Sequence, residues 1–274
     1  MFLVDAFTNE AFKGNPAGVC ILNNDYPDSK VMQSIAKYYN WSEIAFIKYL
    51  ADDYFAIRWF SPLDEAKICG HATLASSYVI FNKHLNKSNK IQFESKSGKL
   101  FANYLKNNSI ALTFPLIKVN KCKVFPFNIK EIFGINKYIE VLTDGVIYIV
   151  VLNNYEDVFN INPNFDLIKQ VNARAIAVTA KYNNKYDFCS RYFAPSVGIY
   201  EDPVCGSLHC RLAYYWSNIL NKKHLVAYQA SKRSGILNLS VDNTNNTVQI
   251  IGNATITVII NDIILNNIEN NEAI

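Results

Sequence analysis

The chain has 274 residues, of which 27 are basic and 23 are acidic, so its formal net charge is +4. Half of the residues are hydrophobic, which supports a packed core and excludes a mainly disordered chain. The small basic excess forms no dense Lys/Arg cluster, so the composition does not favour binding to nucleic acid or to a membrane surface. The length suits two domains better than one.

The N-terminal segment and the cysteines favour a cytoplasmic protein. Asp5 interrupts the first apolar run and no basic segment precedes it, so a signal peptide is not expected. No stretch approaches the roughly 18 apolar residues that cross a bilayer, and no membrane partner is expected. The six cysteines form no CxxC pair, and we expect them to be reduced thiols.

The first half of the chain predicts strands with two helices between them. The alternation of apolar and polar residues and the Gly, Pro and Asn turns indicate the strands, and apolar residues at helical spacing indicate the helices. The predicted strands cover 1–8, 18–23, 42–50, 53–60 and three short segments within 90–115, and the predicted helices cover 25–40 and 71–85.

The second half repeats this style. Its strands are again short and are separated by Asn-rich or Gly-containing turns. The predicted strands cover 145–153, two segments within 173–193, 224–230, 235–242, 247–253 and 254–260, and the predicted helices cover 165–172 and 207–221.

One phrase occurs once in each half of the chain. The sequence "RWFSPLDEAKICGHATLASSY" begins at Arg58, and "RYFAPSVGIYEDPVCGSLHCRLAYY" begins at Arg191. Both contain an arginine, an aromatic residue, Phe, a small residue and Pro, then an acidic residue and Cys-Gly before a helical pattern. The arginines lie 133 residues apart, close to half the chain length. This spacing indicates an internal duplication.

The position of Cys-Gly predicts an anion site in each half. Glycine lets the backbone turn tightly and approach a ligand. The first amides of a helix lack intrahelical partners, and the helix dipole favours negative charge there. Two similar lobes, packed face to face, would bring two such helix starts to one cleft, which is a common place for a small-molecule site.

The segments "VDAFTNEAFKGNPAGV", "SEIAF", "FSPLDEAKICGHATLAS" and "RYFAPSVGIYEDPVCGSLHC" together resemble the PhzF-like, or phenazine biosynthesis-like, family. The resemblance implies an α+β protein with the diaminopimelate epimerase fold: two similar lobes, each a barrel-like β-sheet wrapped around a central helix. It also implies a homodimer, a cofactor-independent isomerase and an active site between the lobes. We expect lobes at residues 1–117 and 118–274, with the C-terminal strand able to return to the first lobe.

The resemblance also implies roles for single residues. Glu43, in "NWSEIAF", matches the family's catalytic glutamate, which takes a proton from one carbon and returns it to another. A partly buried glutamate suits this task, because desolvation raises its pKa toward neutrality. His71 would face the cleft and orient the substrate or assist the proton transfer, and Asp202 would hold an amino or hydroxyl group. By residue type alone, Glu43 is an exposed strand carboxylate, His71 a core or helix-start histidine and Asp202 a turn cap.

The substrate-binding residues are expected at the two helix starts and at one turn. Backbone and hydroxyl groups there would bind the carboxylate of a small substrate. These residues are Gly70, Thr73, Gly206, Ser207 and Asn15, and Asn15 has the alternative of only shaping its turn.

Cys69 and Cys205 suggest a second mechanism. Epimerases of this fold place one cysteine at each helix start, where one thiolate removes an α-proton and the opposite thiol returns it. Here Ala72 and Leu208 occupy positions where the epimerases have glycine, and this departure favours a packing role for the thiols. Both alternatives stay open, as does a non-catalytic ligand-binding or interaction protein of the same fold.

Two further patterns have structural alternatives. Cys205 and His209 are four residues apart and could bind a metal on a helix, but no further ligand set is visible, so no metal site is predicted. Arg58 and Arg191 could face the substrate, or they could form ion pairs at equivalent strand positions. The family resemblance therefore implies an isomerase that works without a cofactor, and the two helix starts predict a small carboxylate-bearing substrate.

Overall fold

The computed structural model describes residues 1–182 and 185–260. The chain divides into two compact units. The first unit contains Met1–Leu112 and the described residues from Gly252 onward, and the second unit contains Thr113–Ile251. Among the described residues, no helix has both the length and the apolar character needed to cross a membrane.

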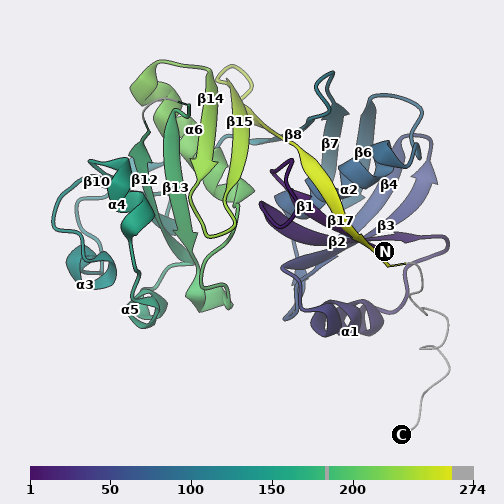
Figure 1. The fold of residues 1–274 in the computed structure, drawn as a ribbon, viewed down its shortest axis with the longest axis horizontal. Helices are drawn as coiled ribbons and strands as arrows, with labels where there is room; N and C mark the ends of the chain where they lie inside the picture. The colour runs from purple at the N-terminus through teal and green to yellow at the C-terminus, as the bar shows by residue number, and fades with distance from the viewer. Residues whose placement is uncertain (183–184, 261–274) are drawn as a thin grey trace, which may run out of the picture. The chain divides into compact units, whose positions relative to one another are not determined.

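The first unit is a mixed sheet with two helices (Figure 1). Its strands are β1 (Phe2–Ala6), β2 (Asn15–Leu22), β3 (Glu43–Ala51), β4 (Tyr54–Phe60), β5 (Glu65–Ala66), β6 (Lys90–Ser95), β7 (Gly98–Tyr104), β8 (Ile110–Pro115) and β17 (Ala254–Ile259), and its helices are α1 (Ser29–Tyr39) and α2 (Gly70–Asn82).

The second unit has the same style of sheet and more short helices. Its strands are β9 (Asn120–Lys121), β10 (Tyr138–Thr143), β11 (Ile147–Leu152), β12 (Ala175–Lys181), β13 (Phe188–Phe193), β14 (His224–Gln229), β15 (Gly235–Asp242) and β16 (Thr247–Gly252). Its helices are α3 (Ile129–Phe133), α4 (Tyr155–Asn160), α5 (Phe165–Gln170) and α6 (Gly206–Leu220), with a 3-10 turn at Pro195–Val197.

The two units repeat one order of strand pairing. In the first unit, β1–β2 is antiparallel, β2–β3 parallel, β3–β4 antiparallel, β4–β6 parallel, and β6–β7 and β7–β8 antiparallel. In the second unit, β10–β11, β11–β12, β12–β13, β13–β14, β14–β15 and β15–β16 follow the same order. Helices connect each parallel pair, because parallel neighbours need a crossover. The duplicated phrase is thus matched by a duplicated topology.

Helix α2 forms the centre of the first unit. Ten of its residues, from His71 to Phe81, are buried, and the helix packs against β1, β2, β3 and β17. Figure 1 shows α2 amid these strands. A helix that is apolar on all sides needs such a surrounding sheet. Helix α1 is instead amphipathic, and it buries Met32, Ile35 and Ala36 against residues of β2, β3 and β4.

Helix α6 is the counterpart of α2 in the second unit, because it connects the parallel pair β13–β14 as α2 connects β4–β6. It follows β13, buries eight of its residues and packs against β14 and β15. The short helices α3, α4 and α5 contribute Ile132, Val158 and Ile168 to one hydrophobic core with β10–β13. Asn221 ends α6 in the left-handed conformation, and its N–H donates to Ser217 O, which is a common way for a helix to stop.

A C-terminal strand completes the first unit. β17 pairs antiparallel with β1, from Phe2 opposite Ile259 to Ala6 opposite Ala254. The N-terminal ammonium of Met1 also donates to Ile260 O at 2.8 Å. In the second unit, β9 pairs antiparallel with β10. In sequence, β17 follows the last hairpin of the second unit (β15–β16), and β9 follows the last hairpin of the first unit (β7–β8).

Candidate active site at the start of helix α2

Both Cys-Gly pairs lie at helix starts. Cys69 is the N-cap of α2 and Cys205 is the N-cap of α6, both with extended backbone angles. The first helical residues, Gly70 and Gly206, are partly exposed. Backbone N–H groups at such positions have no intrahelical partner and favour a bound anion.

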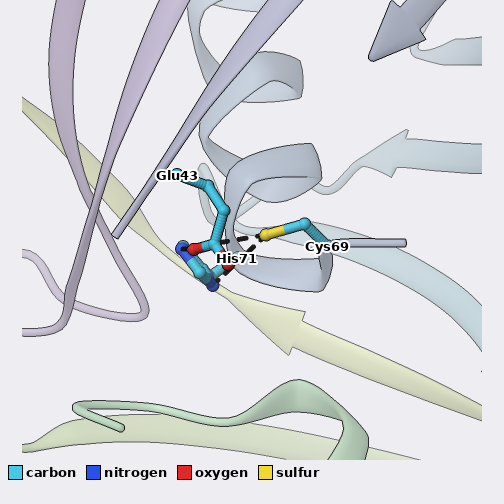
Figure 2. Close-up of side chains that lie close together, drawn as sticks. All are labelled: Glu43, Cys69 and His71. Atoms are coloured by element: carbon cyan, nitrogen blue, oxygen red, sulfur yellow. Dashed lines mark hydrogen bonds and ion pairs between the residues drawn. The ribbon is translucent and has the colours of Figure 1, made fainter. Parts of the chain in front are cut away.

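Three functional groups converge at the start of α2. His71 Nε2 lies 3.0 Å from Glu43 Oε2, and Cys69 Sγ lies 3.6 Å from His71 Nδ1 and 3.8 Å from Nε2. Figure 2 shows the side chains of Glu43, His71 and Cys69 close together beside the first turn of α2. Glu43 is the first residue of β3, and strand β3 packs against α2. The fold therefore joins a strand carboxylate to two residues of the helix start.

The environment of this cluster favours a charged imidazole. Although burial disfavours the imidazolium, the negative charges of Cys69 and Glu43 and hydrogen bonds to both raise the pKa of His71 well above its usual value. Burial raises the pKa of the Cys69 thiol, and the Glu43 carboxylate adds to this rise. The Glu43 carboxylate is thus held by a protonated histidine, and the Cys69 thiol beside them adds to the charge that favours the imidazolium only in its ionised form.

Thr73 stabilises the same helix start from within. It is fully buried, and its Oγ1 donates to Cys69 O at 2.6 Å. In the second unit His209 takes this position: its Nδ1 lies 2.8 Å from Cys205 O. The imidazole of His209 therefore faces a backbone carbonyl rather than the Cys205 thiol, which does not favour the Cys205–His209 metal pair.

The start of α6 carries a different set of polar groups. Cys205 Sγ lies 3.3 Å from Ser207 Oγ, and burial, followed by the nearby Asp202 carboxylate, raises the pKa of the Cys205 thiol. Asp202 Oδ1 accepts from Val204 N at 3.1 Å. Ser207 is exposed and Asp202 half-buried, so both can meet a ligand.

Gln229 is a structural residue that the sequence alone did not single out. Its side chain is fully buried at the end of β14. Its Oε1 accepts from Cys205 N at 2.8 Å, and its Nε2 donates to Asp202 O at 2.6 Å. Gln229 thus fixes the loop that carries Asp202 and Cys205. A polar residue at the end of an apolar strand pattern was the available signal.

The repeated topology shows that the two helix starts are not equivalent in chemistry. Glu43 is the first residue of β3, and Ala175 is the first residue of β12. Three residues after Glu43, Phe46 pairs with Arg58; three residues after Ala175, Val178 pairs with Arg191. Glu43 and Ala175 therefore occupy equivalent positions. The second unit therefore has alanine in place of Glu43, and Ser207 in place of His71.

Arg58 and Arg191 form matching ion pairs. Arg58 binds Glu65 through Nε and Nη2 at 2.8 Å each. Arg191 binds Glu201 through Nε at 2.7 Å and Nη2 at 3.0 Å. Of the two alternatives for these arginines, the structure supports the structural ion pair.

Asn15 lies at a constrained turn. It is buried as the first residue of β2, opposite Ala6 of β1. Gly14 precedes it with φ +62°, and a Cβ there would meet Ala6 O at 2.1 Å. The backbone of "KGNPAG" thus requires this glycine, and the turn fixes where Asn15 begins the strand.

Comparison with known proteins gives a consistent result. The family model described as "Phenazine biosynthesis-like protein" matches residues 4–259. A Halalkalibacterium halodurans protein named as an uncharacterized isomerase is 40% identical over 97% of this chain and 98% of its own. A Pseudomonas aeruginosa protein with the same kind of name is 39% identical over 88% of this chain and 90% of its own.

A solved structure confirms the fold. The crystal structure of a phenazine biosynthesis protein of the PhzF family from Enterococcus faecalis matches with a TM-score of 0.87 and 38% identity, and covers 94% of this chain and 96% of the other. The expected α+β architecture of the diaminopimelate epimerase type is thereby confirmed.

Proposed function

Because the chain belongs to the phenazine biosynthesis-like family, we propose that it is a cofactor-independent isomerase that moves a proton on a small carboxylate-bearing substrate. The two relatives named as isomerases support this reaction class. The observation that carries the proposal is the contact of 3.0 Å between His71 Nε2 and Glu43 Oε2.

In this proposal Glu43 is the acid/base. The protonated His71 donates to one carboxylate oxygen of Glu43 and so fixes its orientation. The second oxygen takes a proton from one substrate carbon and returns it to another. The Gly70 amide at the start of α2 stabilises the negative charge that develops on the substrate.

Residues of the second unit are proposed to bind the substrate. Asp202 would hold an amino or hydroxyl group, and the Gly206 amide and the Ser207 hydroxyl would bind a carboxylate. The convergence of both helix starts and Asn15 on one substrate remains a prediction from the repeated sequence, as does the homodimer that the family resemblance implies.

The test is the isosteric variant Glu43→Gln. A thermal-shift screen of small carboxylates and amino acids would first supply a ligand, and NMR in heavy water would then follow proton exchange on that ligand. We expect Glu43→Gln to lower the exchange rate by about 10²–10⁴-fold, the usual share of one acid/base. The exposed-carboxylate variant Glu131→Gln should keep the wild-type rate.

A second readout does not need the substrate. Removing the Glu43 charge should lower the pKa of His71, because this carboxylate is one of the groups that raise it. An NMR titration of the His71 ring would measure the shift. Wild-type exchange in Glu43→Gln would remove Glu43 from the mechanism.

The position of the two thiols keeps a second candidate, a two-cysteine epimerase or racemase. Cys69 and Cys205 are both helix N-caps, as that mechanism requires. It predicts deuterium at a substrate α-carbon, lost in both Cys69→Ala and Cys205→Ser. The mechanism would be refuted by wild-type exchange in either variant.

A further inference from the structure

The cluster of Glu43, His71 and Cys69 has a composition that proton transfer alone does not require. We propose that it is also a site for a thiophilic divalent cation of the Zn²⁺ type, and that the bound cation inhibits the enzyme. The inhibitory part rests on the proposed function of Glu43, whereas the binding part does not.

The ligand atoms are close to the required geometry. The carboxylate oxygen, the imidazole nitrogen and Sγ all lie within 4.8 Å of one another. Tetrahedral zinc with bonds of about 2.0–2.3 Å needs separations of about 3.4 Å between N and O and about 3.6 Å between N and S. The corresponding distances from His71 Nε2 are 3.0 Å to Glu43 Oε2 and 3.8 Å to Cys69 Sγ. Small side-chain rotations would therefore complete three ligands.

The charge and the burial of the cluster also suit a soft dication. On binding, the Cys69 thiol and the His71 imidazolium would each release a proton to solvent. The resulting thiolate and the carboxylate together balance a charge of +2, and the neutral imidazole adds the third bond. The side chains of His71 and Glu43 are only 9% and 15% exposed, so few water molecules compete for the cation. A site with three protein ligands leaves the fourth position open. Mg²⁺ and Ca²⁺ prefer sites made of oxygen atoms and should not bind.

The second helix start is a natural control within the same chain. Cys205 is also a buried N-cap, but Ser207 stands where His71 stands, and Ala175 stands where Glu43 stands. Among the described residues, the cluster at α2 brings three ligand atoms within 4.8 Å of one another, and no group of three or more His, Cys, Asp or Glu side chains at the start of α6 is as close. Binding should therefore depend on Cys69 and not on Cys205.

The consequence for catalysis follows from the shared carboxylate. Zinc bonded to Oε2 would withdraw negative charge from the Glu43 carboxylate and so lower the basicity of the second oxygen, which takes the proton, and a metal-bound imidazole nitrogen cannot donate to Glu43. Occupancy of the site should therefore inhibit the proton transfer that we propose for the free protein.

The experiment uses untagged, reduced, full-length protein and two probes, Zn²⁺ and Co²⁺. Calorimetry should show one Zn²⁺ per chain, and Co²⁺ should give a near-ultraviolet thiolate-to-cobalt charge-transfer band and the intense visible bands of a tetrahedral site. Cys69→Ala should abolish the charge-transfer band and weaken Zn²⁺ binding by about 100-fold or more, since even outer ligand partners contribute about 10–100-fold. Cys205→Ala should retain both the band and the affinity, and Mg²⁺ should give no signal.

The outcomes separate the two proposals. Absence of stoichiometric binding, or a band that persists in Cys69→Ala, would overturn the metal site whatever the enzyme does. Binding through Cys69 with unchanged proton exchange would keep the site but refute inhibition at Glu43. Loss of exchange in Glu43→Gln together with a silent Co²⁺ titration would support the proposed function alone.

Discussion

A fall in pH should destabilise the protein through one buried histidine of the second unit. His209 is fully buried, and its Nδ1–H donates to Cys205 O at 2.8 Å. In the described structure Nε2 has no hydrogen-bond partner. A proton on Nε2 would thus add a buried charge without an acceptor, and burial lowers the pKa of His209 from 6.5 to about 4.

The magnitude follows from the linkage between protonation and folding. The unfolded chain takes up a proton at His209 near pH 6.5, whereas the folded chain takes it up only near pH 4. The stabilising contribution is complete above pH 6.5 and is lost as the pH falls toward 4. At about 1.4 kcal/mol per pKa unit, the loss between pH 7 and pH 4.5 is roughly 2–2.5 kcal/mol.

The perturbation that isolates this effect is His209→Asn. The asparagine amide can occupy the place of Nδ1 and donate to Cys205 O, but it does not titrate. Urea unfolding at several pH values would compare the two proteins by fluorescence of Trp216, which stacks on Phe188 beside His209. The smaller side chain of the variant should change its free energy of unfolding by the same amount at every pH. A difference from wild type that stays flat within about 0.5 kcal/mol between pH 7 and pH 4.5 would refute the argument, since roughly 2 kcal/mol is expected.

Two other substitutions test contacts that position the fold. Gln229→Leu removes the hydrogen bonds of Gln229 to the N–H of Cys205 and the carbonyl of Asp202, so the free energy of unfolding should fall by about 2–4 kcal/mol in denaturant titrations. The control Gln33→Leu removes one half-buried hydrogen bond to Ser61 O and should cost about 1 kcal/mol at most. Equal losses in the two variants would contradict the role assigned to Gln229. Gly252→Ala should lower the melting temperature, because its Cβ would meet the buried Phe7 ring at 2.5 Å and overpacking costs about 1–3 kcal/mol; an unchanged melting temperature would show that Phe7 can move away.

The repeated phrase predicted the main features of the fold because it lies where local signals are strong. Cys-Gly followed by an apolar run predicted both α2 and α6, and alternating residues predicted most strands. The sequence did not predict α3, α4 or β10. The helices have only five and six residues, which is too short for a helical period to show, and packing into a shared core with β10–β13 stabilises them. Tertiary contacts thus decide these elements, not local propensity.

The candidate site was predictable in parts. Cys69 and His71 lie two residues apart at one helix start, so their contact is local. Glu43 lies 26 residues before Cys69, and by residue type alone it is an exposed carboxylate. Only the family resemblance assigned it to the site, and the packing of β3 on α2 brings it to 3.0 Å from His71. Gln229 is marked by its polar side chain at the end of an apolar strand pattern, but no local signal identifies its partners Cys205 and Asp202, which lie in a distant segment.

The pairing of β17 with β1 has a consequence for synthesis on the ribosome. Strand β1 needs β17 on one side and β2 on the other, yet the ribosome makes these partners at opposite ends of the chain. All residues of the second unit leave the exit tunnel before β17 does. Until β17 is synthesised, β1 therefore has one unpaired edge and the part of α2 that β17 covers is exposed. Nascent chains are most prone to aggregate during that interval.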